Sequence, residues 1–203
     1  MTEPFPVLIV PGLHDSGPAH WQSLWQIKHP AYRRVLQRDW DIPHLGTWTR
    51  SLSREIRRAE GRPLIVAHGF GCLTAVNCMA REAADIAGAL LVAPVNLSKL
   101  ELEDGLPQQK LTVPTILVAS RNDPWLSFRD AQALAARWGS TLADLGHAGH
   151  INSEAGYGAW PEGEALLTQL HAAAARAEAP ALTPAALNSA ARAHTRDTRQ
   201  PET

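Results

Sequence analysis

Short apolar runs recur along the chain, and each is bounded by glycine, proline or polar residues. A continuous apolar run of about four to eight residues between turn signals is typical of a strand buried in a parallel sheet. Such runs predict strands at residues 7–10, 64–67, 88–92, 115–119 and 141–145, with a weaker sixth at 33–37. Helical patterns fill the gaps at residues 19–28, 47–59, 70–81, 127–138 and 159–175. Strand and helix alternate, which predicts an α/β protein whose parallel sheet of about six strands carries helices on both faces.

The length of the chain favours one domain. A chain of 203 residues with 45% hydrophobic content can bury one substantial core, which we place in residues 1–177. The connection at residues 94–114 is short and polar, so we expect a minimal cap or none. Residues 178–203 carry few large apolar side chains, and burial there cannot offset the entropy of ordering. We expect a mobile tail, with a docked short helix near residues 184–193 as the alternative.

Charge and targeting signals exclude several classes of partner. The 19 basic and 20 acidic residues give a net charge of −1 without long blocks of one sign, which disfavours nucleic acid and acidic membranes as partners. Residues 1–6 lack the pattern of a signal peptide, and no apolar run approaches the roughly 20 residues of a membrane span. We therefore expect a soluble cytoplasmic protein. Cys72 and Cys78 lie six residues apart on one predicted helix, on different faces, and cannot form a disulfide there.

Residues 64–72 have the layout of a nucleophile elbow. They read Leu-Ile-Val-Ala-His-Gly-Phe-Gly-Cys, an apolar strand that breaks at small residues and enters a helix. Gly69 occupies the position of the attacking serine. Glycine adopts the strained backbone of this turn at almost no cost, but it has no hydroxyl, and loss of a triad nucleophile lowers turnover by on the order of 10⁶. Covalent catalysis through residue 69 is excluded, and we expect Cys72 to be buried toward the sheet and not to replace the serine.

Two further side chains occupy the remaining positions of a catalytic triad. A serine hydrolase needs a histidine base and a carboxylate that fixes the histidine tautomer, and in α/β-hydrolases the order along the chain is nucleophile, acid, histidine. Asp123 directly follows the strand at residues 115–119, and His150 follows the strand at 141–145. We predict Asp123 as the acid and His150 as the base. His147 and Asp144 are weaker competitors, since Asp144 should lie within the last strand.

Several motifs strengthen this interpretation. They are Ser-Arg-Asn-Asp-Pro-Trp at residues 120–125, Gly-His-Ile-Asn-Ser-Glu-Ala-Gly at 149–156, Trp-Pro-Glu-Gly at 160–163 and the opening segment at 11–22. Together they resemble the small α/β-hydrolases of the retinoblastoma-binding-protein-9-like and YdeN-like family, over about residues 7–170. The resemblance implies a single-domain α/β-hydrolase fold and an Ala-His-Ser-x-Gly elbow. Ala67 fits that elbow, and Gly69 departs from it.

The oxyanion hole and the substrate pocket are predicted from the same loops. Two backbone amides should bind the oxyanion, one from the residue after the nucleophile and one from the loop after the first strand. Phe70 fits the first position, where the positive end of the following helix assists it. Leu13 is favoured for the second, with His14 as the alternative. Most of the seven tryptophans are expected in the core, whereas Trp40 and Trp125 are predicted to line an acyl pocket with His14.

The leading hypothesis is a hydrolase of ester, thioester or amide bonds that takes a small-molecule acyl substrate and needs no metal or organic cofactor. The Gly69 form should be inactive or very slow, through either an engineered serine-to-glycine change or a natural loss, and the intact acid, base and oxyanion loop favour recent or deliberate loss. One alternative is a pseudo-hydrolase that binds a ligand or a protein without turnover. Another is slow hydrolysis by a water that His150 and Asp123 activate. A dinucleotide fold is disfavoured because the glycine spacing and a phosphate loop are missing.

Overall fold

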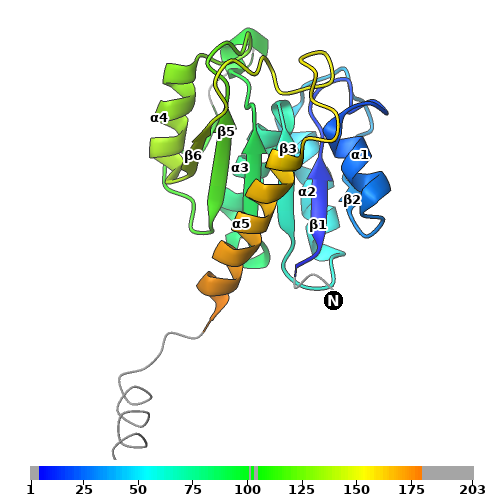
Figure 1. Ribbon diagram of the computed structural model, residues 1–203. Coiled ribbons are helices and arrows are strands. Elements are labelled where there is room, and N and C mark those ends of the chain that lie inside the picture. Colours follow the sequence, from blue (N-terminus) through cyan, green and yellow to red (C-terminus); the bar gives the residue numbers. More distant parts are fainter. Residues whose placement is uncertain (1–4, 101, 103–104, 180–203) are drawn as a thin grey trace, which may run out of the picture.

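The computed structural model describes residues 5–100, 102 and 105–179. One parallel sheet of six strands runs through it in the order β2-β1-β3-β4-β5-β6 (Figure 1). The strands are β1 (Val7–Val10), β2 (Arg33–Arg34), β3 (Leu64–His68), β4 (Gly88–Val92), β5 (Thr115–Ala119) and β6 (Thr141–Asp144). The prediction of an α/β protein with a parallel six-stranded sheet is confirmed.

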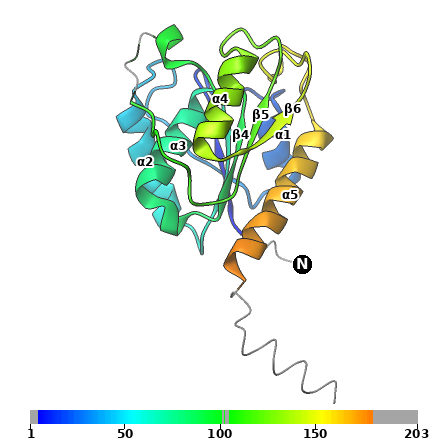
Figure 2. The same cartoon turned by 90° about the vertical axis from the view of Figure 1, so that its left-hand side faces the viewer.

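Helices cover both faces of the sheet, as Figure 2 shows in side view. The helices are α1 (Trp21–Lys28), α2 (Leu45–Arg57), α3 (Phe70–Glu82), α4 (Phe128–Trp138) and α5 (Pro161–Glu178), with the short 3₁₀ helices η1 (Ala83–Asp85) and η2 (Leu97–Leu100). Helices α1 and α5 pack on one face, while α2, α3 and α4 pack on the other. Within the described residues, none of these helices is long and apolar enough to span a membrane.

The observed elements differ from the predicted ones mainly at their ends. β2 is only two residues long where a run over residues 33–37 was predicted, because it is an edge strand whose register with β1 covers only Arg33 and Arg34. Helix α1 begins at Trp21, since the His20 side chain accepts a hydrogen bond from the amide of Gln22 and caps the helix. Glu178, where the predicted tail begins, is the last residue of α5, and residues 180–203, with the alternative short helix at 184–193, lie outside the described residues.

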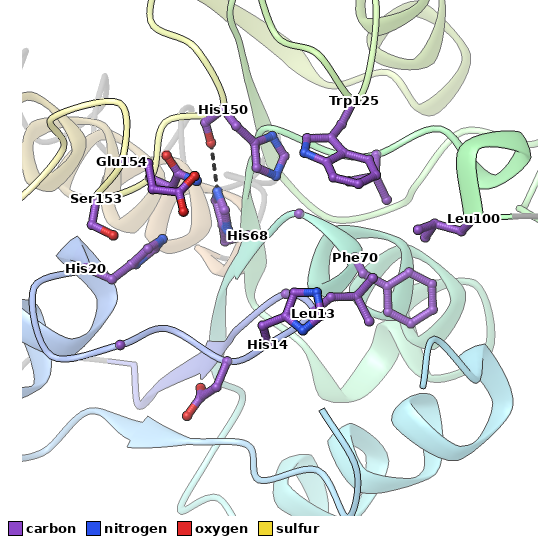
Figure 3. A pocket seen from close by; sticks show the side chains of 16 residues that line it. Leu13, His14, His20, His68, Phe70, Leu100, Trp125, His150, Ser153 and Glu154 are labelled. Atoms are coloured by element: carbon purple, nitrogen blue, oxygen red, sulfur yellow. Dashed lines mark hydrogen bonds between the residues drawn. The ribbon is translucent and has the colours of Figure 1, made fainter. Parts of the chain in front are cut away.

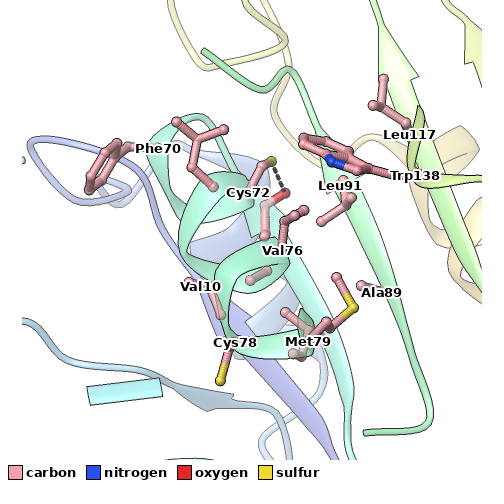
Figure 4. Close-up of a cluster of buried hydrophobic side chains, with 14 of the residues drawn as sticks. Val10, Phe70, Cys72, Val76, Cys78, Met79, Ala89, Leu91, Leu117 and Trp138 are labelled. Atoms are coloured by element: carbon pink, nitrogen blue, oxygen red, sulfur yellow. Dashed lines mark hydrogen bonds between the residues drawn. The ribbon is translucent and has the colours of Figure 1, made fainter. Parts of the chain in front are cut away.

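Two apolar clusters, one on each face, hold the helices to the sheet. Figure 4 shows the cluster in which α3 packs against the strands, with Val76 and Met79 of the helix near Ala89 and Leu91 of β4. The tryptophans buried in the two clusters are Trp21, Trp25, Trp48, Trp138 and Trp160. A fully buried side chain of this size contributes at least about 1.5–3 kcal/mol to folding. Most tryptophans therefore belong to the core, as predicted.

The strand order fixes where a ligand can bind. β2 lies on one side of β1, and the chain then crosses β1 to form β3 on its other side, before β4, β5 and β6 follow outward. The loops after β1 and β3 consequently diverge at the carboxyl ends of the strands. In open parallel sheets, a crevice for ligands forms at this reversal of strand order. The elbow at residue 69 stands at this crevice.

Candidate active site

The turn between β3 and α3 has the geometry of a nucleophile elbow. Gly69 has φ +54° and ψ −123°, a conformation that costs a residue with a Cβ roughly 1–2 kcal/mol. At Gly71, a Cβ would clash with the backbone oxygens of Val10 and Pro11, so glycine lets α3 begin directly against the loop after β1. Gly69 therefore allows the backbone conformation of the turn, and Gly71 allows α3 to approach the loop after β1 closely.

His150 and Asp123 form a buried pair beside this turn. Nδ1 of His150 lies 2.9 Å from Oδ2 and 3.0 Å from Oδ1 of Asp123, and the Asp123 side chain is only 3% exposed. A carboxylate accepts hydrogen bonds, so Nδ1 carries the proton and Nε2 is left as a base. A Cβ built on Gly69 would lie 3.4 Å from this Nε2. The structure thus brings the predicted acid, base and nucleophile positions together.

Hydrogen bonds from two strands fix the loop that carries His150. Asn122, after β5, accepts a hydrogen bond from the Gly149 amide at 2.8 Å, and the Ser120 hydroxyl accepts one from the Ala148 amide at 2.9 Å. His68, the last residue of β3, lies 2.9 Å through Nε2 from the carbonyl oxygen of His150 (Figure 3). A carbonyl only accepts, so this nitrogen of His68 is the protonated one. The base is positioned through its backbone as well as through Asp123.

The imidazole rings of His20, His68 and His150 lie next to one another, with His68 between the other two. The ring of His68 is 4.8 Å from the ring of His20 and 4.8 Å from that of His150. Burial lowers the pKa of His68 well below its usual value, and the neighbouring imidazoles lower it further. Burial, followed by the positive charge of Arg34, lowers the pKa of His20 to about 4. His20 and His68 are therefore neutral at pH 7.

Phe70 and Leu13, whose backbone amides are candidates for binding an oxyanion, both line the cavity beside the turn. The backbone amide of Phe70 is the first of α3, so it has no acceptor within the helix. The amide of His14 donates a hydrogen bond to the Trp40 carbonyl oxygen at 2.9 Å, so it is not free to bind an oxyanion. Leu13, which lines the cavity, is left as the second candidate, in line with the preference from sequence.

A cavity of about 260 Å³ lies above the turn. Of the predicted site residues, it is lined by Leu13, His14, Gly69, Phe70, Trp125 and His150, with Asp123 behind the imidazole. Trp40 is not among the lining residues; it packs edge-on against Trp48. Sequence reasoning missed the lining residues Asp15, His20, His68, Val95, Leu100, Asn152, Ser153 and Glu154. Several of these lie inside the motifs quoted above, whereas Leu100 lies in a connection without a motif.

The competing residues do not face the cavity. Asp144 ends β6 and pairs with Arg121 at 2.6 Å, and this hydrogen bond holds the pKa of its carboxyl below the usual value. Cys72 points to the sheet (Figure 4). Its Sγ lies 3.2 Å from the Val92 carbonyl oxygen. Burial raises the pKa of its thiol well above the ordinary value. A buried neutral thiol is a poor nucleophile, as predicted for Cys72. Within the part of the chain that the structure describes, no three His, Cys, Asp or Glu side chains gather to hold a metal.

Comparisons with known proteins bear on the family and the fold. Residues 7–169 match the family model described as serine hydrolase. A protein from Pectobacterium atrosepticum, assigned as a YdeN-like hydrolase, is 38% identical with a TM-score of 0.81 over 84% of this chain and 92% of its own. The ydeN product of Bacillus subtilis is 22% identical with a TM-score of 0.71 over 82% and 98%. A Bacillus cereus carboxylesterase, 15% identical with a TM-score of 0.56 over 85% and 90%, shares the fold. No curated protein sequence matches this chain.

Proposed function

Because this chain belongs to the serine hydrolase family, we propose that its cavity is an active site for ester, thioester or amide hydrolysis in which Gly69 occupies the nucleophile position. The substrate is a small acyl compound. The present form is impaired at the first chemical step, since residue 69 has no hydroxyl to attack a carbonyl. The observation that carries the proposal is the 3.4 Å between a Cβ at residue 69 and Nε2 of His150.

In a form with serine at position 69, each group has a defined role. His150 takes the hydroxyl proton through Nε2 while the serine oxygen attacks the carbonyl carbon, and the amides of Leu13 and Phe70 bind the oxyanion. The leaving group departs with the proton from His150, and a water molecule activated by the same imidazole then releases the acid. Asp123 keeps Nδ1 protonated and stabilises the imidazolium. These steps need no metal or organic cofactor.

The test restores the hydroxyl. The Gly69→Ser variant should hydrolyse p-nitrophenyl hexanoate and should be labelled covalently by a fluorophosphonate probe at residue 69, as mass spectrometry can show. The unchanged protein should do neither at a comparable rate. A folded Gly69→Ser protein that neither turns over the ester nor reacts with the probe would refute the proposal.

A second candidate is a pseudo-hydrolase that binds an acyl ligand without turnover. Gly69 itself favours it, because the cavity and the His150–Asp123 pair are complete without a nucleophile. Calorimetry with hexanamide separates the two candidates. Equal affinity for hexanamide in the present protein and in Gly69→Ser, with no ester turnover in either, would support the binding function.

A further inference from the structure

The loop after β1 lies directly against the turn between β3 and α3. A Cβ built on Gly12 would lie 3.4 Å from the amide nitrogen of Phe70, which is one of the two candidate oxyanion donors. The next residue, Leu13, carries the other candidate amide and lines the cavity (Figure 3). The conformation of this loop therefore sets where the second donor points. A misplacement of about 1 Å at a catalytic group can lower a rate by on the order of 10²-fold.

Two strained residues follow Leu13 in this loop. His14 and Asp15 have φ values of +62° and +60°, in the left-handed region that residues with a Cβ seldom adopt. Such a conformation persists only where surrounding contacts determine it. The amide of His14 has one such contact, the hydrogen bond at 2.9 Å to the Trp40 carbonyl oxygen. The segment at Asp15 needs contacts of its own.

Arg34 of β2 provides these contacts. Its Nη1 donates to Oδ1 of Asp15 at 2.6 Å and to the carbonyl oxygen of Ser16 at 3.0 Å. Its Nη2 and Nε donate to the side chains of Ser23 and Gln26 in α1, both at 2.7 Å. The Arg34 side chain is only 16% exposed, so its ion pair is less screened than one at the surface. The rigid fork of the guanidinium thus fixes the loop relative to both β2 and α1.

A buried glutamine ties the end of the same loop to the sheet. The hydroxyl of Ser16 donates to Oε1 of Gln22 at 2.6 Å, and both side chains are buried. The amide nitrogen Nε2 of Gln22 donates to the carbonyl oxygens of Val10 and Val66, at 3.4 and 3.1 Å. This tie fixes where the loop ends, whereas Arg34 binds the strained segment before it.

We propose, resting on the hydrolase function above, that Arg34 is a positioning residue for the oxyanion hole. Through Asp15 and Ser16, it keeps the loop in the conformation that directs the Leu13 amide at the oxyanion. Arg34 is not among the described residues that line the cavity, so it acts through the loop and not on the substrate. Its loss should therefore weaken binding of the transition state, in which the oxyanion forms, more than binding of the ester.

Arg34→Lys in the Gly69→Ser background tests this role. Lysine keeps the positive charge, but its single ammonium group cannot replace the fork. Loss of an oxyanion donor lowers kcat by about 10²–10³, so a displaced donor should lower kcat for p-nitrophenyl hexanoate by about 10- to 100-fold with little change in KM. The affinity for 1,1,1-trifluorooctan-2-one, which becomes an oxyanion when the serine hydroxyl adds to it, should fall by the same factor as kcat.

Arg33→Lys is the matched control on the same strand. Arg33 is exposed, and its guanidinium donates to the carbonyl oxygens of Glu55 and Arg58 at the end of α2. Neighbouring residues of a strand point to opposite faces, so this substitution repeats the chemical change away from the loop. Arg33→Lys should leave kcat, KM and the affinity for the trifluoroketone unchanged.

Asp15→Asn tests whether Arg34 acts through the loop. Asparagine adopts a left-handed backbone readily but removes the charge that Arg34 binds, so the variant should also lower kcat. If the two residues act together, the double variant Asp15→Asn/Arg34→Lys should lose no more than about 2-fold beyond Arg34→Lys alone. Effects that multiply in the double variant would show independent roles and would overturn the inference.

Hydrogen exchange measures the loop without any need for catalysis. In the unchanged Gly69 protein, Arg34→Lys should speed exchange of the His14 amide by about 10-fold or more, because the loop loses hydrogen bonds to a charged group. NMR at pH 7 follows this amide. Arg33→Lys should leave its exchange unchanged.

The outcomes separate this inference from the function on which it rests. If Gly69→Ser hydrolyses the ester and Arg34→Lys lowers Tm but neither kcat nor the affinity for the trifluoroketone, Arg34 only stabilises the fold and the inference is wrong. An increase in KM without a loss of kcat would overturn it as well. If Gly69→Ser hydrolyses no ester, the hydrolase function fails and the oxyanion role fails with it. Exchange at His14 then decides by itself whether Arg34 holds the loop.

Discussion

The conformation of the elbow predicts a measurable conflict between stability and activity at residue 69. Its backbone has φ +54°, which penalises a residue with a Cβ by roughly 1–2 kcal/mol. The space itself adds little, because a Cβ there would meet Nε2 of His150 at 3.4 Å and the Cα of Gly12 at 3.7 Å, both ordinary contacts. Backbone strain alone therefore sets the expected loss in free energy of unfolding for Gly69→Ser.

The same substitution should increase activity greatly. Restoring a triad nucleophile raises kcat by on the order of 10⁶, which corresponds to about 8 kcal/mol of barrier. For a protein of this size, a loss of about 1–2 kcal/mol lowers Tm by roughly 2–8 °C. Calorimetric melting at pH 7.5 measures the change in Tm, and hydrolysis of p-nitrophenyl hexanoate measures the change in kcat.

Gly69→Ala separates the two effects. It adds the same Cβ without the hydroxyl, so it should lose as much stability as Gly69→Ser and gain no turnover. A Gly69→Ser protein that melts at or above the temperature of the unchanged protein would show that the turn is not strained. Turnover in Gly69→Ala that matches Gly69→Ser would show that the hydroxyl is not the nucleophile.

Three further predictions follow from the site. In the Gly69→Ser background, Asp123→Asn should lower kcat for p-nitrophenyl hexanoate by about 10⁴, since Nδ1 of His150 loses the acceptor that fixes its tautomer; an effect below 10-fold would contradict the role of Asp123. The pKa of His20 is about 4 in the folded protein and near 6.5 in the unfolded chain, so the unfolded chain binds more protons between these values. The free energy of unfolding should therefore fall below pH 6.5, with about 3 kcal/mol of the loss toward pH 4 due to His20 and a further part due to His68, whose pKa burial also lowers. Urea unfolding across this range should show a shallower decline in His20→Asn, and an identical decline would rule His20 out as the cause. Iodoacetamide at pH 8 should modify Cys72 only after unfolding, because burial raises the pKa of its thiol, and native labelling seen by mass spectrometry would contradict that burial.

The sheet and the proposed triad positions could be predicted from sequence because their signals are local. The buried strands β1, β3, β4 and β5 are continuous apolar runs, and Asp123 follows β5. His150 follows β6, an edge strand that is exposed or only partly buried, where a buried strand was predicted. Parallel strands bring their carboxyl ends to one edge, so residues far apart in the chain were expected to meet there. The pairing of His150 Nδ1 with the Asp123 carboxylate agrees with that expectation. The edge strand β2 was less predictable because only two residues pair with β1.

The walls of the cavity could not be predicted in the same way. His20 and Glu154 come from different loops and lie more than a hundred residues apart in the chain, and neither has a periodic signal. Their placement depends on the path of each loop, which is set by hydrogen bonds such as the cap that His20 provides to α1. Trp40, by contrast, was predicted to line the cavity and does not line it. Its position in the sequence suggested the active face, but the indole packs on Trp48 while its carbonyl holds the His14 amide.

Backbone strain around the site explains why a change at residue 69 leaves the fold intact. His14, Asp15 and Ile151, which lie in the loops around the cavity, carry side chains at φ values of +62°, +60° and +49°. Each such residue costs on the order of 1–3 kcal/mol and persists only where the surrounding contacts determine the turn. The same framework, in which α3 begins against the loop after β1, holds the elbow. A scaffold that maintains three strained side chains can also maintain a serine at residue 69, so folding does not require the glycine there. Under the proposed function, glycine at residue 69 therefore changes the chemistry of the site and leaves the shape of the turn intact.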